Sequence, residues 1–254
     1  MKYIYGPVYS WRLGASLGID PISGKTKVCT YDCVYCQIGR KPPYSGNRKI
    51  FVPTDKIIGE LKKLPKIKID YITFSGSGEP TLAKNLGDII KAIRKIRKEK
   101  IAVLTNSSLI NRKSVQKDLL LADFVAVKLD APREDLFKKI NSPDEKIKFA
   151  ATVKAIKQFK RKFKGKLTLQ IMFVKENKEF AKDIAEIARQ IKPDQIQINT
   201  PTRPCAVMPL NKDEIAGIKK HFKGLNVSCV YESKRKKVEP LSGKATLKRR
   251  PLSK

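Results

Sequence analysis

The chain has 254 residues, enough for one large α/β domain with a substantial core or for two small domains. Hydrophobic residues make up 41% of the composition, and the apolar runs are too short to span a bilayer. The N-terminus lacks the apolar core of a secretory signal. We therefore expect a cytoplasmic protein without a membrane partner, and we expect it to be a monomer.

The net charge is strongly positive. Lys and Arg number 55 against 24 Asp and Glu, which gives a formal net charge of +31. A heat-adapted surface would contain more acidic and more basic residues together, which form ion-pair networks, whereas here more than half of the basic residues lack an acidic partner. Self-repulsion of this size costs stability, so a polyanionic partner explains the charge better. The charge predicts a nucleic-acid partner, with acidic small molecules or membrane surfaces as alternatives.

Strand-like runs alternate with amphipathic helical patterns along the chain. The expected strands are nearly continuous in Ile, Val, Leu, Phe and Tyr, as in parallel strands covered on both faces; they are Lys27–Thr30, Tyr71–Ser75, Ile101–Thr105, Phe124–Leu129, Leu167–Phe173, Gln195–Asn199 and Leu225–Tyr231. The expected helices carry an apolar stripe opposite Lys and Arg; they are Thr54–Leu64, Leu86–Ile96, Arg112–Leu121, Phe149–Phe163, Phe180–Ile191 and Lys212–Phe222. The alternation predicts a parallel sheet with right-handed crossovers, and about six strands favour an incomplete barrel over a closed one.

Three of the five cysteines form a C-x3-C-x2-C pattern just after the first expected strand: Cys29, Cys33 and Cys36. Disulfides among them would leave one cysteine over and would constrain almost nothing. Three thiolates on one loop can bind three corners of a cubic iron–sulfur cluster, and the missing fourth ligand leaves one iron open. A zinc site that recruits Cys205 or Cys229 is an alternative, and a structural or redox cysteine cluster is another.

The remaining candidates for chemistry are few. The single histidine, His221, lies in a Lys-rich helical pattern and is expected on the surface. Histidine-based metal triads, Ser–His–Asp hydrolysis and Cys–His proteolysis are therefore hard to build here. Cys229 lies in an apolar run and is expected to be a small buried hydrophobic residue, while the role of Cys205 stays open.

The cysteine loop resembles the signature of the radical S-adenosylmethionine (radical SAM) superfamily, including an aromatic residue, Tyr35, before the last cysteine. The resemblance implies a partial (β/α)6 TIM-like barrel in which Cys29, Cys33 and Cys36 hold a catalytic [4Fe–4S] cluster. It also implies that S-adenosylmethionine binds at the open iron and is cleaved by an electron from a donor such as ferredoxin or flavodoxin. The 5′-deoxyadenosyl radical formed in this way would abstract hydrogen from a substrate.

Three strand ends carry residues that this resemblance assigns to the cofactor. Gly76-Ser77-Gly78-Glu79 is similar to the Gly-Gly-Glu motif whose backbone binds the methionyl amino group, although Ser77 departs from that motif. Thr105-Asn106-Ser107 is similar to the strand end that contacts the ribose, and Lys128 and Asp130 follow at the next strand end. Without the cysteines, these segments would be interpreted as a turn, a loop or helix cap, and a simple Lys128–Asp130 ion pair.

Two further segments, Gly6–Gly18 and Ile198–Pro204, resemble a poorly characterised radical SAM group that is related to the tRNA wyosine synthases. Those synthases act on a purine of tRNA, so this resemblance and the charge predict RNA modification, with a tRNA nucleoside as the substrate. Arg12, Asn199 and Arg203 are the candidate substrate contacts, since guanidinium groups bind phosphate or carboxylate in a fixed fork. The alternatives are an anionic small molecule or peptide as substrate, and a zinc-containing RNA-binding protein.

The end of the chain has a different composition. Residues 233–254 contain nine Lys or Arg and one Glu, interrupted by Pro240, Gly243 and Pro251. We expect a radical SAM core over residues 1–232 and a short, flexible, basic C-terminal extension over 233–254.

Overall fold

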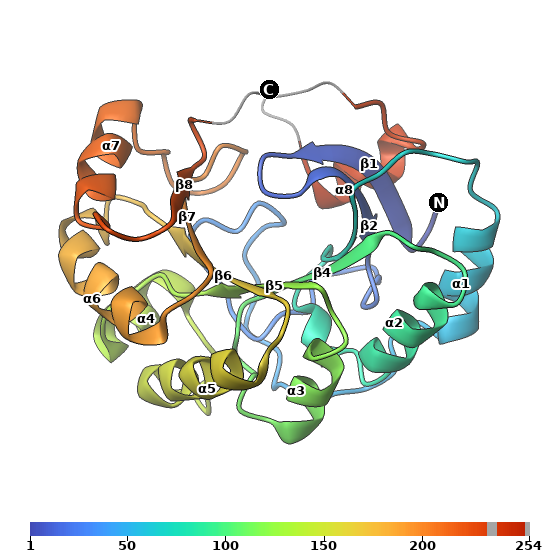
Figure 1. The fold of residues 1–254 in the computed structure, drawn as a ribbon, viewed down its shortest axis with the longest axis horizontal. Helices are drawn as coiled ribbons and strands as arrows, with labels where there is room; N and C mark the ends of the chain where they lie inside the picture. The colour runs from blue at the N-terminus through green and yellow to red at the C-terminus, as the bar shows by residue number, and fades with distance from the viewer. Residues whose placement is uncertain (233–237, 252–254) are drawn as a thin grey trace.

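The computed structural model describes residues 1–232 and 238–251, and these residues form one sheet of eight strands arranged in chain order. β1 pairs antiparallel with β2, and β2 to β8 are parallel to one another. The sheet curls into an open half-barrel (Figure 1). Its strands are β1 (Ile4–Ser10), β2 (Gly14–Ile19), β3 (Tyr71–Phe74), β4 (Lys100–Thr105), β5 (Phe124–Lys128), β6 (Lys166–Met172), β7 (Gln195–Asn199) and β8 (Val227–Cys229).

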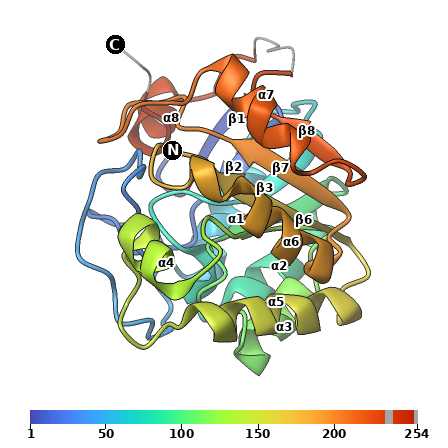
Figure 2. The ribbon, with the colours of Figure 1, turned by 90° about the vertical axis from the view of Figure 1, so that its left-hand side faces the viewer.

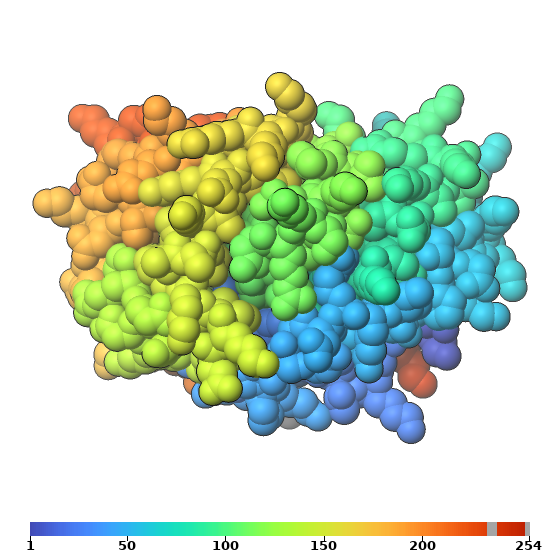
Figure 3. All heavy atoms as spheres, turned by 90° about the horizontal axis from the view of Figure 1, so that it is seen from below, coloured from blue at the N-terminus to red at the C-terminus, as the bar shows by residue number. Residues whose placement is uncertain are grey.

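Helices cover the outer face of the half-barrel (Figures 1 and 2). Viewed from below, α3 and α5 lie on the outside of the molecule (Figure 3). None of the helices in the described residues is long and apolar enough to cross a membrane. They are α1 (Thr54–Lys62), α2 (Leu86–Arg94), α3 (Lys113–Leu119), α4 (Glu134–Asn141), α5 (Phe149–Lys162), α6 (Ala181–Ile191), α7 (Lys212–Lys220) and α8 (Gly243–Arg249), with 3₁₀ turns at η1 (Pro80–Leu82) and η2 (Lys178–Phe180).

The main core lies between the sheet and these helices. Leu17, Ile72 and Val103 from three adjacent strands are fully buried in one cluster with Ile89 and Ile93 of α2. Burying a side chain of this size stabilises the fold by about 1.5–3 kcal/mol. The apolar stripes expected from the sequence therefore form the contact surface between the helices and the sheet. This packing holds the strands, and so their carboxyl ends, in place.

The predicted fold class, a partial barrel of the TIM type, is confirmed, but its first strand was placed wrongly. Lys27–Thr30 is not a strand, because Val28 makes only an isolated bridge to Gly78. The strand that precedes the cysteine loop is β2, which the prediction missed. The short helix α4 was also not expected. The other predicted strands and helices correspond to β3–β8, α1–α3 and α5–α7, with shifts of a few residues at their ends.

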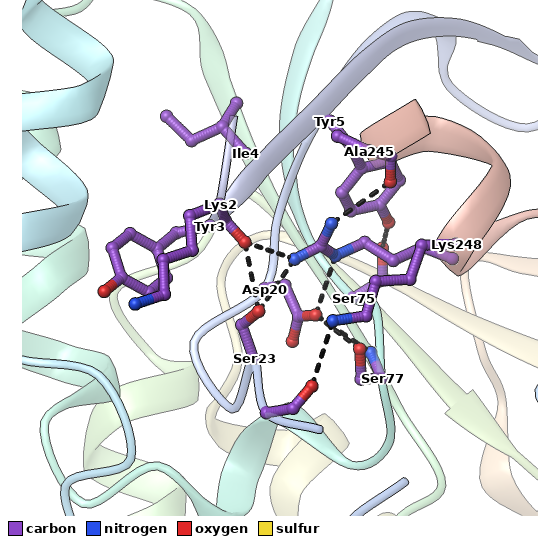
Figure 4. Close-up of polar contacts among 12 residues, drawn as sticks. Lys2, Tyr3, Ile4, Tyr5, Asp20, Ser23, Ser75, Ser77, Ala245 and Lys248 are labelled. Atoms are coloured by element: carbon purple, nitrogen blue, oxygen red, sulfur yellow. Dashed lines mark hydrogen bonds and ion pairs between the residues drawn. The ribbon is translucent and has the colours of Figure 1, made fainter. Parts of the chain in front are cut away.

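Part of the predicted flexible extension is instead folded against the N-terminal hairpin. Helix α8 packs on β1, where the Gly6 amide donates to Thr246 Oγ1 at 3.0 Å. The guanidinium of Arg249 is buried against Asp20, and Asp20 also accepts hydrogen bonds from Ser77 (Figure 4). The prediction of a flexible tail is therefore wrong for α8, because a buried ion pair anchors it. Residues 233–237 and 252–254 lie outside the described residues.

Candidate active site

A cavity of about 290 Å³ opens at the carboxyl ends of the parallel strands. Its lining includes residues at or just after the ends of β3 to β7, together with the cysteine loop between β2 and α1. Arg249 and Arg250, at the end of α8, also line it. Active sites of barrel proteins of this type lie at this end of the strands, so the fold and the predicted residues indicate the same place.

The three cysteines of the loop all line this cavity, and each is partly exposed to it. Backbone hydrogen bonds tie the loop to the glycine motif after β3: the Val28 amide donates to the Ser77 carbonyl, and the Glu79 amide donates to the Val28 carbonyl, both at 3.0 Å. On its other side, the Val34 amide donates to the Ile140 carbonyl of α4 at 2.9 Å. The loop is thus held between β3 and α4.

Two amide side chains point their donors at cysteine sulfurs. Asn106 Nδ2 lies 3.5 Å from Cys29 Sγ, and Asn141 Nδ2 lies 3.4 Å from Cys33 Sγ. Burial raises the pKa of both thiols, so they stay protonated at neutral pH unless a metal displaces the proton. Hydrogen-bond donors of this kind stabilise metal-bound thiolate sulfur, and they set the properties of iron–sulfur centres. The residues present therefore fit a cluster held by these thiolates.

A mononuclear metal site has a different geometry. Within the described ranges 1–232 and 238–251, no group of three Cys, His, Asp or Glu side chains converges closely enough to hold a single metal ion. Cys229 is buried in β8, as expected for a small hydrophobic residue, and it does not line the cavity.

Close packing explains both glycines of the Gly-Ser-Gly-Glu segment. Gly76 and Gly78 have φ values of +141° and +153°. A Cβ atom on Gly78 would lie 1.8 Å from the Val28 carbonyl oxygen, and one on Gly76 would lie 2.5 Å from the Asp20 carboxyl carbon. Glycine is therefore required for the close approach of the cysteine loop, and it leaves bare backbone facing the cavity.

Glu79 joins the ends of β3 and β4. Its buried carboxylate accepts hydrogen bonds from Thr105 Oγ1 at 2.7 Å, from the Asn106 amide at 2.6 Å and from the amide and hydroxyl of Thr81. Burial raises the Glu79 pKa despite these donors. The network fixes Asn106, whose side chain also donates to Thr30 Oγ1 at 2.9 Å, against the cysteine loop.

A second buried network lies behind Tyr35. The Tyr35 hydroxyl donates to Asp130, which also accepts from Asn141 Nδ2 at 2.8 Å and from the Met172 amide at 2.7 Å. Lys128 Nζ lies 3.5 Å from the Asp130 carboxylate and 4.7 Å from the centre of the Tyr35 ring. The simple Lys128–Asp130 pair considered from the sequence is thus present, as part of a larger network.

Most of the sequence-predicted site residues come together around the cavity, while three lie behind its lining. Ser77 turns its hydroxyl to Asp20 at 2.7 Å, Ser107 hydrogen-bonds to the Lys128 backbone, and Asp130 holds Tyr35. These three side chains therefore support their neighbours and do not line the cavity. The predicted residues that line it are Arg12, Cys29, Cys33, Tyr35, Cys36, Gly76, Gly78, Glu79, Thr105, Asn106, Lys128, Asn199 and Arg203.

Several lining residues were missed by sequence reasoning. Gln37 follows the last cysteine, and its Oε1 accepts from Arg203 Nη1 at 2.7 Å. Gln170 lies on β6, where alternation of side chains could have identified it as inward-facing. Arg249 and Arg250 were assigned to a flexible tail, and no local sequence pattern indicates that their helix packs beside the cavity.

Comparisons with known proteins agree with this geometry. The family model described as "Radical SAM superfamily" matches residues 25–191, more than half of the chain. A UPF0026 protein of Synechocystis is 44% identical over 202 residues, covering 79% of this chain and 76% of its own length. A probable GTP 3′,8-cyclase of Saccharolobus solfataricus is 24% identical over 173 residues, covering 68% of this chain and 54% of its own length.

The fold is also similar to that of a solved structure. Streptococcus suis SuiB bound to S-adenosylmethionine superposes with a TM-score of 0.63 at 15% identity. The match covers 80% of this chain and 48% of SuiB, so this chain spans about half the length of that protein. From the family match over residues 25–191, together with the cysteine loop, we conclude that the chain belongs to the radical SAM superfamily.

Proposed function

We propose that this chain is a radical SAM enzyme in which Cys29, Cys33 and Cys36 hold a [4Fe–4S] cluster. The observation that carries the proposal is that the three thiols share one cavity with the bare backbone of Gly76 and Gly78. Members of the superfamily use such a cluster together with S-adenosylmethionine. When bound, the cluster supplies an electron that cleaves S-adenosylmethionine to methionine and a 5′-deoxyadenosyl radical, and a ferredoxin or flavodoxin would donate that electron.

The protein itself would bind and orient S-adenosylmethionine and shield the radical formed from it. The backbone at Gly76 and Gly78 is open to a methionyl group, and Thr105 and Asn106 lie next to it at the end of β4. The side-chain amide of Asn106 would stabilise the Cys29 thiolate, because its Nδ2 atom contacts the sulfur. The strand ends form the floor of the cavity and would shield the radical from oxygen and from hydrogen donors other than the substrate.

The test uses protein reconstituted with iron and sulfide without oxygen. Wild type should be brown, contain about four irons per chain and yield 5′-deoxyadenosine from S-adenosylmethionine and reductant. Cys33→Ala should lose the colour and the product, whereas Cys229→Ala, which removes a thiol remote from the cavity, should keep both. A colourless zinc protein, or product formed by Cys33→Ala, would contradict the proposal.

For the substrate, we favour a nucleoside of RNA, with tRNA as the first candidate. The net charge of +31 supports a polyanionic partner, and Arg12 and Arg203 line the cavity where that partner would enter. Binding of RNA through phosphates falls steeply with salt, and the target base would be presented in a loop or flipped out. Comparing the nucleosides of tRNA from cells with and without the gene tests this assignment, and an unchanged profile would contradict it.

A free anionic small molecule is the second candidate. The similarity to a protein named as a probable GTP 3′,8-cyclase, whose substrate is a small nucleotide, favours it. It predicts turnover that changes little with salt and no binding of bulk tRNA. Salt titration of the purified enzyme therefore separates the two candidates.

A further inference from the structure

Arg12 and Arg250 line the cavity, and neither has a carboxylate partner in the parts of the chain that the structure describes. The Nε atom of Arg12 is buried and makes no hydrogen bond there. Three other cations of the lining are paired with carboxylates, in the pairs Lys27–Asp32 at 3.0 Å, Lys128–Asp130 at 3.5 Å and Arg249–Asp20 at 2.8 Å, and Arg203 donates to Gln37 Oε1 at 2.7 Å.

The two arginines come from opposite ends of the chain and line the same cavity. Arg12 belongs to the turn between β1 and β2, and Arg250 directly follows α8. Burial, and secondly the charge of Arg250, lower the Arg12 pKa to about 10, and burial also lowers the pKa of Arg250. Placing two cations in one partly buried cavity costs free energy, because each loses water and repels the other. A bound anion would offset this cost.

The neighbouring lining also has unused hydrogen-bonding atoms. Gln170 Nε2 and Asn199 Oδ1 are buried at the ends of β6 and β7, and within the described residues neither has a hydrogen-bond partner. Gln37 links the loop after β7 to α8, since it accepts from Arg203 and donates to the Arg249 carbonyl at 3.3 Å. The cavity that the two arginines line therefore also offers a free donor and a free acceptor to a ligand.

We infer that Arg12 and Arg250 bind a phosphoryl group of the substrate, and that α8 is thereby part of the substrate site. The inference rests on the proposed function and deepens it. Guanidinium groups match phosphate oxygens with paired N–H donors. The terminal phosphate of a nucleotide is a dianion and balances two cations, and two neighbouring phosphodiester groups of RNA, each a monoanion, do the same; a single carboxylate balances only one. The chemistry therefore holds for the backbone of RNA and for a free nucleotide.

The carboxylate of S-adenosylmethionine is the competing ligand for these arginines. If they bound it, neutralising either arginine would weaken the binding of S-adenosylmethionine and leave phosphate binding unchanged. If they bind the substrate, the opposite result is expected. Measuring both ligands on the same variants separates the two assignments.

The experiment titrates inorganic pyrophosphate into the full-length, cluster-loaded protein by calorimetry, with acetate as the carboxylate probe. Arg12→Gln and Arg250→Gln should each weaken pyrophosphate binding by about tenfold or more, because a charge-assisted hydrogen-bond pair is lost. Arg161→Gln removes the same charge from the exposed face of α5 and should leave the affinity unchanged. Arg250→Lys, which keeps the charge, should lie between wild type and Arg250→Gln. Acetate should bind more weakly than pyrophosphate.

Three outcomes would overturn the inference: equal losses in Arg161→Gln, unchanged binding in both cavity variants, or weakened S-adenosylmethionine binding with pyrophosphate binding intact. Thermal unfolding of each variant checks that it is folded. The proposed function fails separately, if cluster-loaded wild type binds pyrophosphate but yields no 5′-deoxyadenosine. Conversely, 5′-deoxyadenosine formation with no pyrophosphate binding would contradict the phosphoryl site and leave the proposed function intact.

Discussion

Arg249 and Asp20 form an ion pair at 2.8 Å whose side chains are only 1% and 0% exposed. The Arg249 guanidinium also donates to the Lys2 carbonyl at 2.6 Å and to Ser23 Oγ at 2.8 Å, while Asp20 accepts from the Ser77 amide at 3.2 Å. One buried guanidinium thus joins α8, the N-terminal strand and the glycine motif. Removing one partner of such a pair leaves an uncompensated buried charge.

Asp20→Asn is expected to lower the free energy of unfolding by about 3–5 kcal/mol, because Arg249 would keep its charge without a counter-ion. Urea denaturation measures the change. The matched control is Asp135→Asn, which breaks the exposed Arg133–Asp135 pair at 2.8 Å and should change the free energy of unfolding little, because solvent screens the pair. Equal effects of the two substitutions would show that the buried pair contributes no more than a surface one.

Gly78→Ala is expected to disrupt the cysteine loop, since the new Cβ would lie 1.8 Å from the Val28 carbonyl oxygen. Iron content after reconstitution should fall well below the wild-type value, together with stability. Gly59→Ala is the control: Gly59 lies in α1 with nothing within 4 Å of an added Cβ, so the substitution should stabilise by about 0.5–1 kcal/mol. Wild-type iron content in Gly78→Ala would contradict the packing argument.

Tyr35→Phe tests whether Tyr35 supports the site or contacts the cofactor. Its hydroxyl donates to the buried Asp130 carboxylate, so the variant should lose about 1–3 kcal/mol of stability. Affinity for S-adenosylmethionine, measured on cluster-loaded protein, should stay within a factor of about two because the ring is retained. A large loss of affinity at unchanged stability would instead indicate a direct contact to the cofactor.

The reactivity of Cys229 should depend on pH. Burial, and secondly Glu232, raise its pKa to about 11, so the thiol is protonated and unreactive at pH 8. In cluster-loaded protein, iodoacetamide should modify the partly exposed Cys205 at least about tenfold faster than Cys229. Alkylation of Cys229 should accelerate about tenfold per pH unit and level off only near its pKa. Mass spectrometry of tryptic peptides follows both sites, and comparable rates at pH 8 would refute the expectation.

The amphipathic helices and the buried parallel strands were predictable because their periodicity follows directly from burial. Strand β2 was not, because Gly14, Ser16 and Gly18 are poor strand formers. Gly18 is needed there since the Tyr5 ring occupies the space of a Cβ, 2.1 Å away. The residues 27–30 have strand-forming side chains, but only Val28 pairs, with Gly78. In β2 and in residues 27–30, tertiary contacts therefore outweigh the local strand propensity of the residues.

The residues of the candidate site were predictable where a local sequence pattern marks them. They were not predictable where their position depends on the packing of distant segments. The cysteines and the strand ends after β3, β4 and β5 were identified because each follows a recognisable pattern. Nothing near Arg250 in the sequence indicates that it lines the same cavity as Arg12, because its position depends on the burial of Arg249. From its composition alone, the basic segment that contains α8 is expected to lie in solvent. It is instead packed against the fold because Asp20, far away in the sequence, pairs with Arg249.

The contact between Asp20 and Arg249 joins positions 229 residues apart. Closing so long a loop costs more chain entropy than any neighbouring strand pairing, and contacts of such high contact order form late. The parallel strands and the cysteine loop can therefore assemble before the wall formed by α8 is in place. We therefore expect α8 to complete the wall of the cavity late in folding.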